Sequence, residues 1–176
     1  MPGKNFVLYV RNFIFGAEDS LVSTVGLLSG VAIGGVAKVD ILLTGMVLIF
    51  VEAFSMAVGS FLTEYSAEEY VNRAKVSISN PFAGGVVMFF SYLFTGLIPL
   101  WPYVVFDINP AFWVSIASSV VGLSLLGVVS ARVLRIPLLG SALRMTLIGA
   151  VAIAVGALIG QIFKHQKNGT LILWCL

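Results

Sequence analysis

Long apolar stretches separated by short polar connections dominate this sequence. Five of them occupy approximately residues 19–39, 41–62, 83–106, 111–131 and 142–163. A helix of about 20 apolar residues is long enough to cross the hydrocarbon core of a bilayer. Only 10% of the residues are charged, whereas soluble domains carry about 25%. The pattern therefore predicts an all-α integral membrane protein whose five transmembrane helices form a single domain over residues 1–176.

Polar residues and prolines indicate where these helices begin. Residues 2–15 mix apolar and polar positions at helical spacing, which predicts an amphipathic helix lying on the membrane surface. Glu18 and Asp19 are then expected at the N-terminus of the first span, where carboxylates are favourable. Asn80-Pro81 and Asn109-Pro110 predict the starts of the third and fourth spans, because asparagine caps helices and proline is tolerated in the first turn.

Two further boundaries follow from single residues. Asp40 is expected to cap the second span, which should continue past its apolar part as a polar helix reaching Lys75. Pro99 and Pro102 are expected to kink or end the third span, because proline removes a helical hydrogen bond. Every connection is short, so no soluble domain is expected.

Basic residues are distributed unequally between the two ends of the predicted helices. Seven lie at the end that includes the N-terminus, and three lie at the opposite end, namely Lys38, Lys164 and Lys167. Because the cytosolic connections of membrane proteins carry an excess of lysine and arginine, the N-terminus is predicted to be cytosolic.

Glycine recurs in the first span at Gly26, Gly30 and Gly34, giving a doubled GxxxG motif. In a membrane this spacing permits two helix backbones to approach closely. The partner helix could belong to a second copy of the chain or to the same chain. The motif is therefore compatible with a homodimer and with an internal contact.

The second span carries the most informative polar residues. Glu52 lies near its middle, and an ionisable residue at that depth is costly unless it faces a cavity or a partner. Met56 follows four residues later on the same face, and Gly59 continues this face and would let another backbone come close. A carboxylate beside a thioether suits a borderline transition metal better than Mg²⁺ or Ca²⁺. The alternatives are a space-filling methionine and a glutamate hydrogen-bonded between helices.

Further acids follow the apolar part of the second span. Glu64 and Glu68 are four residues apart and share a helical face. Acidic residues at the mouth of a path attract cations, which makes both candidate metal ligands. A solvated helix surface would show the same pattern.

The composition excludes several classes of function. No basic tract or RNA-binding motif is present, so no nucleic-acid partner is expected. Serine residues without a histidine in the spans provide no nucleophile–base pair, which argues against an enzyme. Cys175 and His165 are the only residues of their types, which excludes an internal disulfide and a cysteine or multi-histidine metal cluster within one chain.

These observations lead to a hypothesis about transport. The acids of the spans are concentrated in the first two helices, where carboxylates could replace the hydration water of a crossing transition ion. The same oxygens bind protons, so metal and proton would compete for them. Two protomers meeting along their glycine-lined helices would double the few ligands of one chain, which favours a symmetric homodimer. The alternatives are a passive divalent-cation channel and a membrane scaffold or sensor without transport activity.

Four motifs, in order along the chain, resemble those of the vacuolar iron transporter family. The stretch Arg11–Gly26, in which Asp19 follows a Gly-Ala-Glu step, is similar to the family's first-helix signature. Ser55-Met56-Ala-Val-Gly59 matches its Ser-Met-x-x-Gly signature. Residues 96–103 resemble the end of its third helix, and residues 143–160 resemble its fifth. The resemblance covers nearly the whole chain.

This resemblance implies a homodimer that exports Fe²⁺ or Mn²⁺ from the cytosol in exchange for protons. Asp19 and Met56 would be the metal ligands within the membrane. The metal ions are the transported substrate, and no permanently bound cofactor is implied.

The sequence departs from the family pattern at two places. Ser60 stands where the family usually has glutamate directly after Ser-Met-x-x-Gly, and Glu52 is expected to supply the lost carboxylate. About 18 residues, 64–81, stand where plant and parasite members carry a long glutamate-rich cytosolic domain. Glu64, Glu68 and Glu69 are candidate remnants of that domain. The short connection predicts a minimal member from a prokaryotic cell membrane, or from a vacuolar membrane if the source is eukaryotic.

Overall fold

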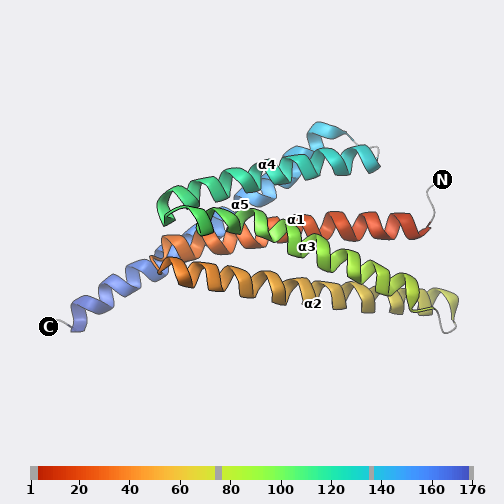
Figure 1. Cartoon of the computed structure of the whole chain (residues 1–176), viewed down its shortest axis with the longest axis horizontal. Helices are drawn as coiled ribbons and strands as arrows, with labels where there is room; N and C mark the ends of the chain where they lie inside the picture. Colours follow the sequence, from red (N-terminus) through yellow and green to blue (C-terminus); the bar gives the residue numbers. More distant parts are fainter. Residues whose placement is uncertain (1–3, 74–76, 135–136, 175–176) are drawn as a thin grey trace.

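Five long α-helices make up the described part of the molecule (Figure 1). The computed structural model describes residues 4–73, 77–134 and 137–174. The helices are α1 (Lys4–Ile33), α2 (Lys38–Asn72), α3 (Ser79–Val105), α4 (Ile108–Leu134) and α5 (Leu138–Trp174). Each is long and apolar enough to cross a membrane. The prediction of an all-α protein with five membrane-spanning helices is therefore confirmed.

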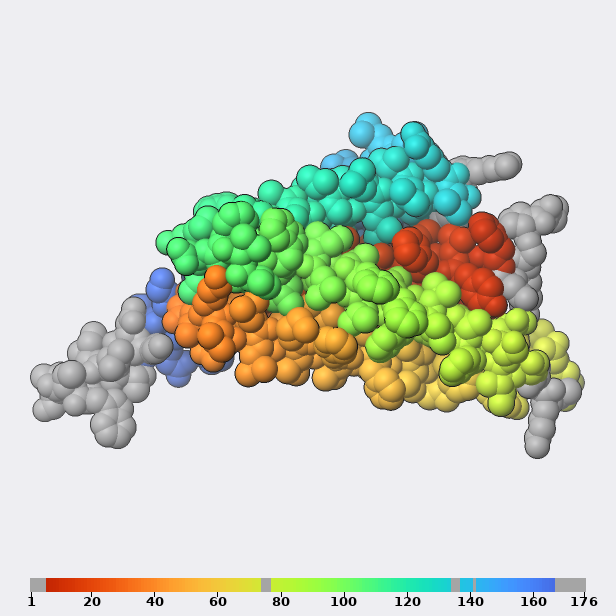
Figure 2. All heavy atoms as spheres, in the orientation of Figure 1, coloured from red at the N-terminus to blue at the C-terminus, as the bar shows by residue number. Residues whose placement is uncertain are grey.

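Helix α1 lies at the centre of the bundle and packs against each of the other four helices. Its buried side chains include the small polar residues Ser20, Thr24 and Ser29, which let neighbouring helices approach closely. Figure 2 shows one face of the molecule, on which α2, α3 and α4 cover most of α1. Helices α2 and α5 keep long apolar faces exposed, as expected where hydrocarbon surrounds the protein.

The N-terminal part of α1 differs from the prediction. A separate surface helix over residues 2–15 is not found, because α1 is continuous from Lys4 to its last turn. Asn12 is only 2% exposed, and a side-chain carbon added at Gly84 of α3 would lie 2.7 Å from its Nδ2 atom. Packing against α3 therefore holds this segment in the bundle. As a consequence Asp19 lies in the middle of α1 and does not begin it.

The expected helix caps are not the observed ones. Helix α2 is preceded by Ala37, which makes no side-chain capping hydrogen bond, and Asp40 lies within the first turn. Helix α3 begins at Ser79, so Asn80 is not its cap, whereas Pro81 lies in the first turn as predicted. Helix α4 likewise begins one residue before its Asn-Pro pair. Ser, Asn and Asp near a helix start mark the region of the start but do not fix its first residue.

The helices also end later than several of the apolar stretches. Helix α2 continues into its polar part as far as Asn72, as predicted. Helix α3 runs through both internal prolines, and Ser118 of α4 donates a hydrogen bond over 3.4 Å to Ile98 O, the carbonyl that Pro102 leaves without its helical donor. Helix α5 reaches Trp174, and Cys175 lies outside the described residues.

Glycines of α1 and α5 meet where these two helices cross. A side-chain carbon at Gly30 would lie 2.7 Å from the carbonyl oxygen of Gly156, and carbons at Gly156 and Gly160 would overlap the carbonyl oxygens of Gly26 and Gly30. Only glycine permits such an approach of two backbones. The doubled GxxxG motif of α1 therefore serves a contact within the chain.

Candidate metal-transport site

Three helices bring polar side chains together in the middle of the bundle. Asp19 of α1 is close enough to Glu52 of α2 for the two carboxyl groups to interact electrostatically. Tyr92 of α3 interacts electrostatically with both. Tyr92 is fully buried, whereas Asp19 and Glu52 are partly exposed. The structure thus joins two of the predicted site residues, from different helices, and adds a phenol to them.

Hydrogen bonds hold Tyr92 against α1. Its hydroxyl oxygen lies 2.7 Å from Ser23 Oγ, and Ser20 Oγ donates to its backbone carbonyl over 2.6 Å. Gly96 makes this approach possible, because a side-chain carbon there would lie 2.7 Å from Ser20 Oγ and 2.9 Å from a carbon of Ile49 on α2. The glycine therefore brings α3 against both acid-bearing helices at the level of the site.

Tyr92 is a site residue that sequence reasoning missed. The available signal was its place well inside an apolar span, since membrane tyrosines concentrate at the two interfaces. The third span contains no acid, so the polar chemistry was assigned to the first two helices alone. Only the packing of α3 against α1 shows which way this tyrosine points.

A stripe of partly buried residues runs along α2 on both sides of Glu52. Every fourth residue belongs to it, and its members are Leu48, Glu52, Met56, Ser60, Glu64 and Glu68. Positions four apart are neighbours on a helix, and because each step turns by about 40° the stripe winds gradually around α2. Between them, Phe50, Val51 and Phe54 are exposed and form the apolar face of the helix. Met56 therefore lies one turn from Glu52 on the partly buried side of α2, as the sequence predicted, and not on its outward apolar face.

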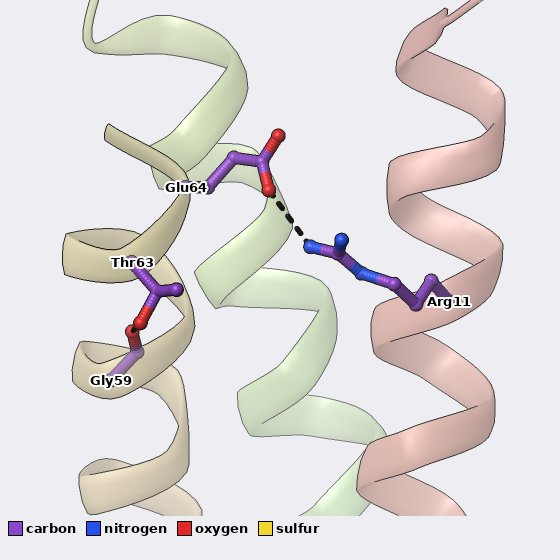
Figure 3. A network of polar contacts seen from close by, with 4 residues as sticks. All are labelled: Arg11, Gly59, Thr63 and Glu64. Atoms are coloured by element: carbon purple, nitrogen blue, oxygen red, sulfur yellow. Dashed lines mark hydrogen bonds and ion pairs between the residues drawn. The ribbon is translucent and has the colours of Figure 1, made fainter. Parts of the chain in front are cut away.

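Gly59 has no close neighbour from another helix within the described residues. It is exposed, and within the described residues no atom lies within 4 Å of a side-chain carbon placed there. Its carbonyl oxygen accepts a hydrogen bond of 2.7 Å from Thr63 Oγ1. Figure 3 shows this pair on a different side of α2 from Glu64. In the described part of the chain, no other helix approaches α2 at this glycine.

Glu64 is paired with a basic residue of α1. A nitrogen of Arg11 lies 2.8 Å from one oxygen of Glu64, and the two side chains are 61% and 16% exposed. Figure 3 shows them reaching toward each other across the space between the helices. One turn further along, Glu68 is partly buried, and Glu69 accepts a hydrogen bond of 2.9 Å from Tyr65. In this conformation the Glu64 carboxylate is held by a guanidinium.

Glu18, the neighbour of Asp19, faces a different part of the molecule. It interacts electrostatically with Arg144 of α5 as well as with Asp19. It also lines a groove between α1 and α4 together with Arg11 and Val133. The two consecutive acids of α1 therefore have different surroundings, and the one that meets Glu52 is Asp19.

An apolar groove of about 870 Å³ extends from the site toward the other end of the bundle. Ser23 and Leu48, each one turn from an acid of the site, line its near part, and Gly34 and Phe163 line its far part. The acids and Ser60 of the α2 stripe thus lie between the site and the end that holds Arg11 and Glu64. An ion would meet favourable ligands from that end and an apolar wall beyond.

The carboxyl groups of one chain make a sparse ligand set. Among the described residues, no three side chains of histidine, cysteine, aspartate or glutamate are grouped as a metal site would need. Asp19, Glu52 and the nearby Met56 provide oxygen and sulfur ligands of the kinds that Fe²⁺ and Mn²⁺ accept. Further ligands would have to come from water or from a second copy of the chain.

A comparison with known protein families identifies the family of this chain. A family model described as the VIT family matches residues 10–77 and 70–161. The chain belongs to the VIT family. The matched residues include the candidate site and parts of all five membrane-spanning helices, so this VIT protein is an integral membrane protein of a metal-ion transporter family. A comparison with curated proteins found no match.

Ser60, the residue that follows Gly59 in α2, has an unusual environment in this VIT protein. The hydroxyl oxygen of Ser60 is buried and has no hydrogen-bond partner among the described residues. It lies on the α2 stripe between Met56 and Glu64. A buried hydroxyl usually finds a partner, so this oxygen is available to a water molecule or an ion that passes along the stripe.

Proposed function

We propose that this VIT protein exports Fe²⁺ or Mn²⁺ from the cytosol in exchange for protons. The observation that carries the proposal is that Asp19, Glu52 and Tyr92, from three different helices of an apolar bundle, lie near enough to interact electrostatically. Ionisable side chains at this depth are costly, and they are typical of ion pathways and proton relays. The geometry supports a transport site better than a structural contact.

The ligand types favour a transition metal as the substrate. Met56 lies one turn from Glu52 on the same stripe, and a thioether binds borderline and soft ions better than Mg²⁺ or Ca²⁺. The Asp19 and Glu52 carboxylates would bind either the metal or protons. Competition for these oxygens provides the coupling between metal export and proton entry.

The polar stripe supports loading from the end of the bundle that holds Arg11 and Glu64. The unequal distribution of basic residues favours a cytosolic position for this end. An ion would then pass Glu64, Ser60 and Met56 before it reaches the acids. The membrane would be a cell membrane in a prokaryotic source.

A homodimer would complete the site. One protomer offers few ligands, and a twofold axis beside α1 and α2 would bring a second set of the same residues to the path. Because the glycines of α1 are used against α5, the contact between protomers would involve other faces, such as the exposed apolar side of α2.

Flux measurements in proteoliposomes test this function. The purified protein is reconstituted, and uptake of Fe²⁺, Mn²⁺, Zn²⁺ and Ca²⁺ is compared with and without an imposed pH gradient. We expect Fe²⁺ and Mn²⁺ flux that increases with the gradient and is lost in Asp19→Asn and Glu52→Gln. Asp40→Asn, the same chemical change at an exposed position of α2, should leave the flux unchanged.

Two other outcomes would replace the proposal. If the flux of the same ions did not depend on the pH gradient, the protein would be a passive divalent-cation channel. Unchanged flux in Asp19→Asn, Glu52→Gln and Met56→Ala would show that these residues do not form the path and would favour a scaffold or sensor.

A further inference from the structure

A second polar cavity lies at the end of the bundle opposite Arg11. Figure 1 shows that the α1–α2 and α3–α4 connections lie at this end, where α5 passes them. The cavity between them has a volume of about 700 Å³. Lys38 at the start of α2, Asp107 before α4 and Lys164 of α5 all line it. The transport site described above uses none of these residues.

The lining of this cavity is positively charged. Two lysines and one aspartate give it a net positive charge. Nζ of Lys38 donates to the backbone carbonyl of Val104 over 3.4 Å, a neutral acceptor that does not compensate its charge. The first turn of α2 offers N–H groups that Ala37 does not cap, and the negative charge of Asp40 in the same turn offsets their positive potential. An anion is therefore the ligand that this lining favours.

The cavity continues into an apolar one. A neighbouring cavity of about 290 Å³ shares Lys164, Ile108 and Asn109 with it and is otherwise lined largely by apolar residues, including Phe112 and Trp113. Trp113 is 70% exposed, which suits a side chain at the boundary between headgroups and hydrocarbon. A free anion would use only the charged part. A molecule with an anionic head and an apolar chain would use both parts.

We propose that this double cavity binds an anionic phospholipid. Lys38 and Lys164 bind the phosphate, and one acyl chain lies along Phe112 and Trp113. Lysines beside a groove between membrane helices are suited to anionic headgroups. The bound lipid would hold together the α1–α2 connection, the start of α4 and the α5 helix, which come from distant parts of the sequence.

Lipid binding can be measured on the whole protein independently of transport. The detergent-purified protein is titrated with phosphatidylglycerol or with phosphatidylcholine of the same acyl chains, and retained lipid is counted by native mass spectrometry. We expect phosphatidylglycerol to be retained preferentially and to raise the melting temperature. Each of Lys38→Gln and Lys164→Gln should weaken its binding about fivefold. Arg132→Gln, which removes an exposed charge at the other end of α4, should not.

Two further measurements distinguish a lipid site from a site that binds any small anion. Trp113→Ala should weaken phosphatidylglycerol binding, and inorganic phosphate should not reproduce the rise in melting temperature. Equal protection by inorganic phosphate, or unchanged lipid preference in Lys164→Gln, would overturn the proposal. Because Lys164 is exposed, this variant should fold even if changes at Lys38 disturb the start of α2. Failure here would leave the proposed metal transport unaffected.

Discussion

Arg11 of α1 and Glu64 of α2 form an ion pair of 2.8 Å that joins the two helices carrying Asp19 and Glu52. The pair lies one turn before the last residue of the α2 stripe, Glu68, so a metal ion that uses Glu64 has to displace a guanidinium. The same ion pair could therefore contribute to the stability of the protein and, through Glu64, to metal capture. Substitutions of the two residues should separate these contributions.

The contribution of the ion pair to the free energy of unfolding should be small. Arg11 is largely exposed, and exposed ion pairs contribute about 0–1 kcal/mol. We expect Arg11→Gln and Glu64→Gln each to lower the free energy of unfolding in detergent by less than about 1 kcal/mol. A double-mutant cycle with both changes measures the coupling. If either change lowered the free energy of unfolding by several kcal/mol, the pair would be more buried than the exposure of Arg11 indicates.

The two substitutions should have opposite effects on metal capture. Arg11→Gln frees the Glu64 carboxylate and should lower the KM for Mn²⁺, whereas Glu64→Gln removes the ligand and should raise it. Initial rates of Mn²⁺ uptake over a range of concentrations provide the comparison. Parallel changes in both variants would show that the pair only positions α1 against α2 and that Glu64 is not a metal ligand.

Substituting alanine for glycine should destabilise the protein where α1 and α5 cross, but not at a helix position that faces open space. Gly156→Ala places a methyl group against the carbonyl of Gly26, and overpacking of this kind costs about 1–3 kcal/mol. Gly59→Ala meets open space and should stabilise α2 by up to about 1 kcal/mol, because alanine is the better helix former. Thermal unfolding in detergent compares the two. Tolerance of alanine at Gly156 would mean that the helices can separate at little cost.

Tyr92→Phe tests the phenol of the site. The change removes the hydrogen bond to Ser23, which should cost about 0.5–1.5 kcal/mol of stability. If the hydroxyl also orients the ligands of the metal, uptake should fall by about two- to tenfold, the same free energy expressed as a rate. Tyr103→Phe is the matched control, since Tyr103 is fully buried on the same helix. Equal loss of uptake in both variants would indicate a general effect of buried tyrosines.

Met56→Leu tests the contribution of sulfur to selectivity. The two side chains have similar volumes, so stability should change by less than about 1.5 kcal/mol. Loss of the thioether should reduce Fe²⁺ uptake more than Mn²⁺ uptake, because Mn²⁺ is the ion less dependent on soft ligands. Competition between the two ions in one vesicle preparation gives the ratio directly. An unchanged ratio would leave Met56 with a packing role only.

The sequence predicted the helices better than their ends. Apolar stretches of sufficient length made five spans inevitable, and the polar continuation of α2 followed from its unbroken helical spacing. The predicted start of α1 was wrong. Glu18 and Asp19 interrupt the apolar stretch, and acidic residues in such a position are typical of the start of a helix. What keeps the helix continuous there is contact with α3 around Asn12 and Gly84, and contacts between distant segments leave no local signal.

For the candidate site, the sequence predicted relative positions along one helix but not which residues of different helices lie close together. The depth of Glu52 in its span indicated function, and the regular spacing correctly placed Met56 on its side of α2. The spacing also suggested a close helix contact at Gly59 that is absent from the described chain. Residues on one helix have predictable relative positions, whereas the proximity of Asp19, Glu52 and Tyr92 depends on how three helices pack.

The glycine crossing of α1 and α5 limits how this molecule can change shape. Two backbones in direct contact cannot slide without collision, so these helices should move as one rigid unit that carries Asp19. An alternating-access cycle would then be carried by α2, which would rock against that unit and move Glu52 away from its partner acid. Spin-label distances should stay constant between α1 and α5 while those between α1 and α2 vary with metal concentration.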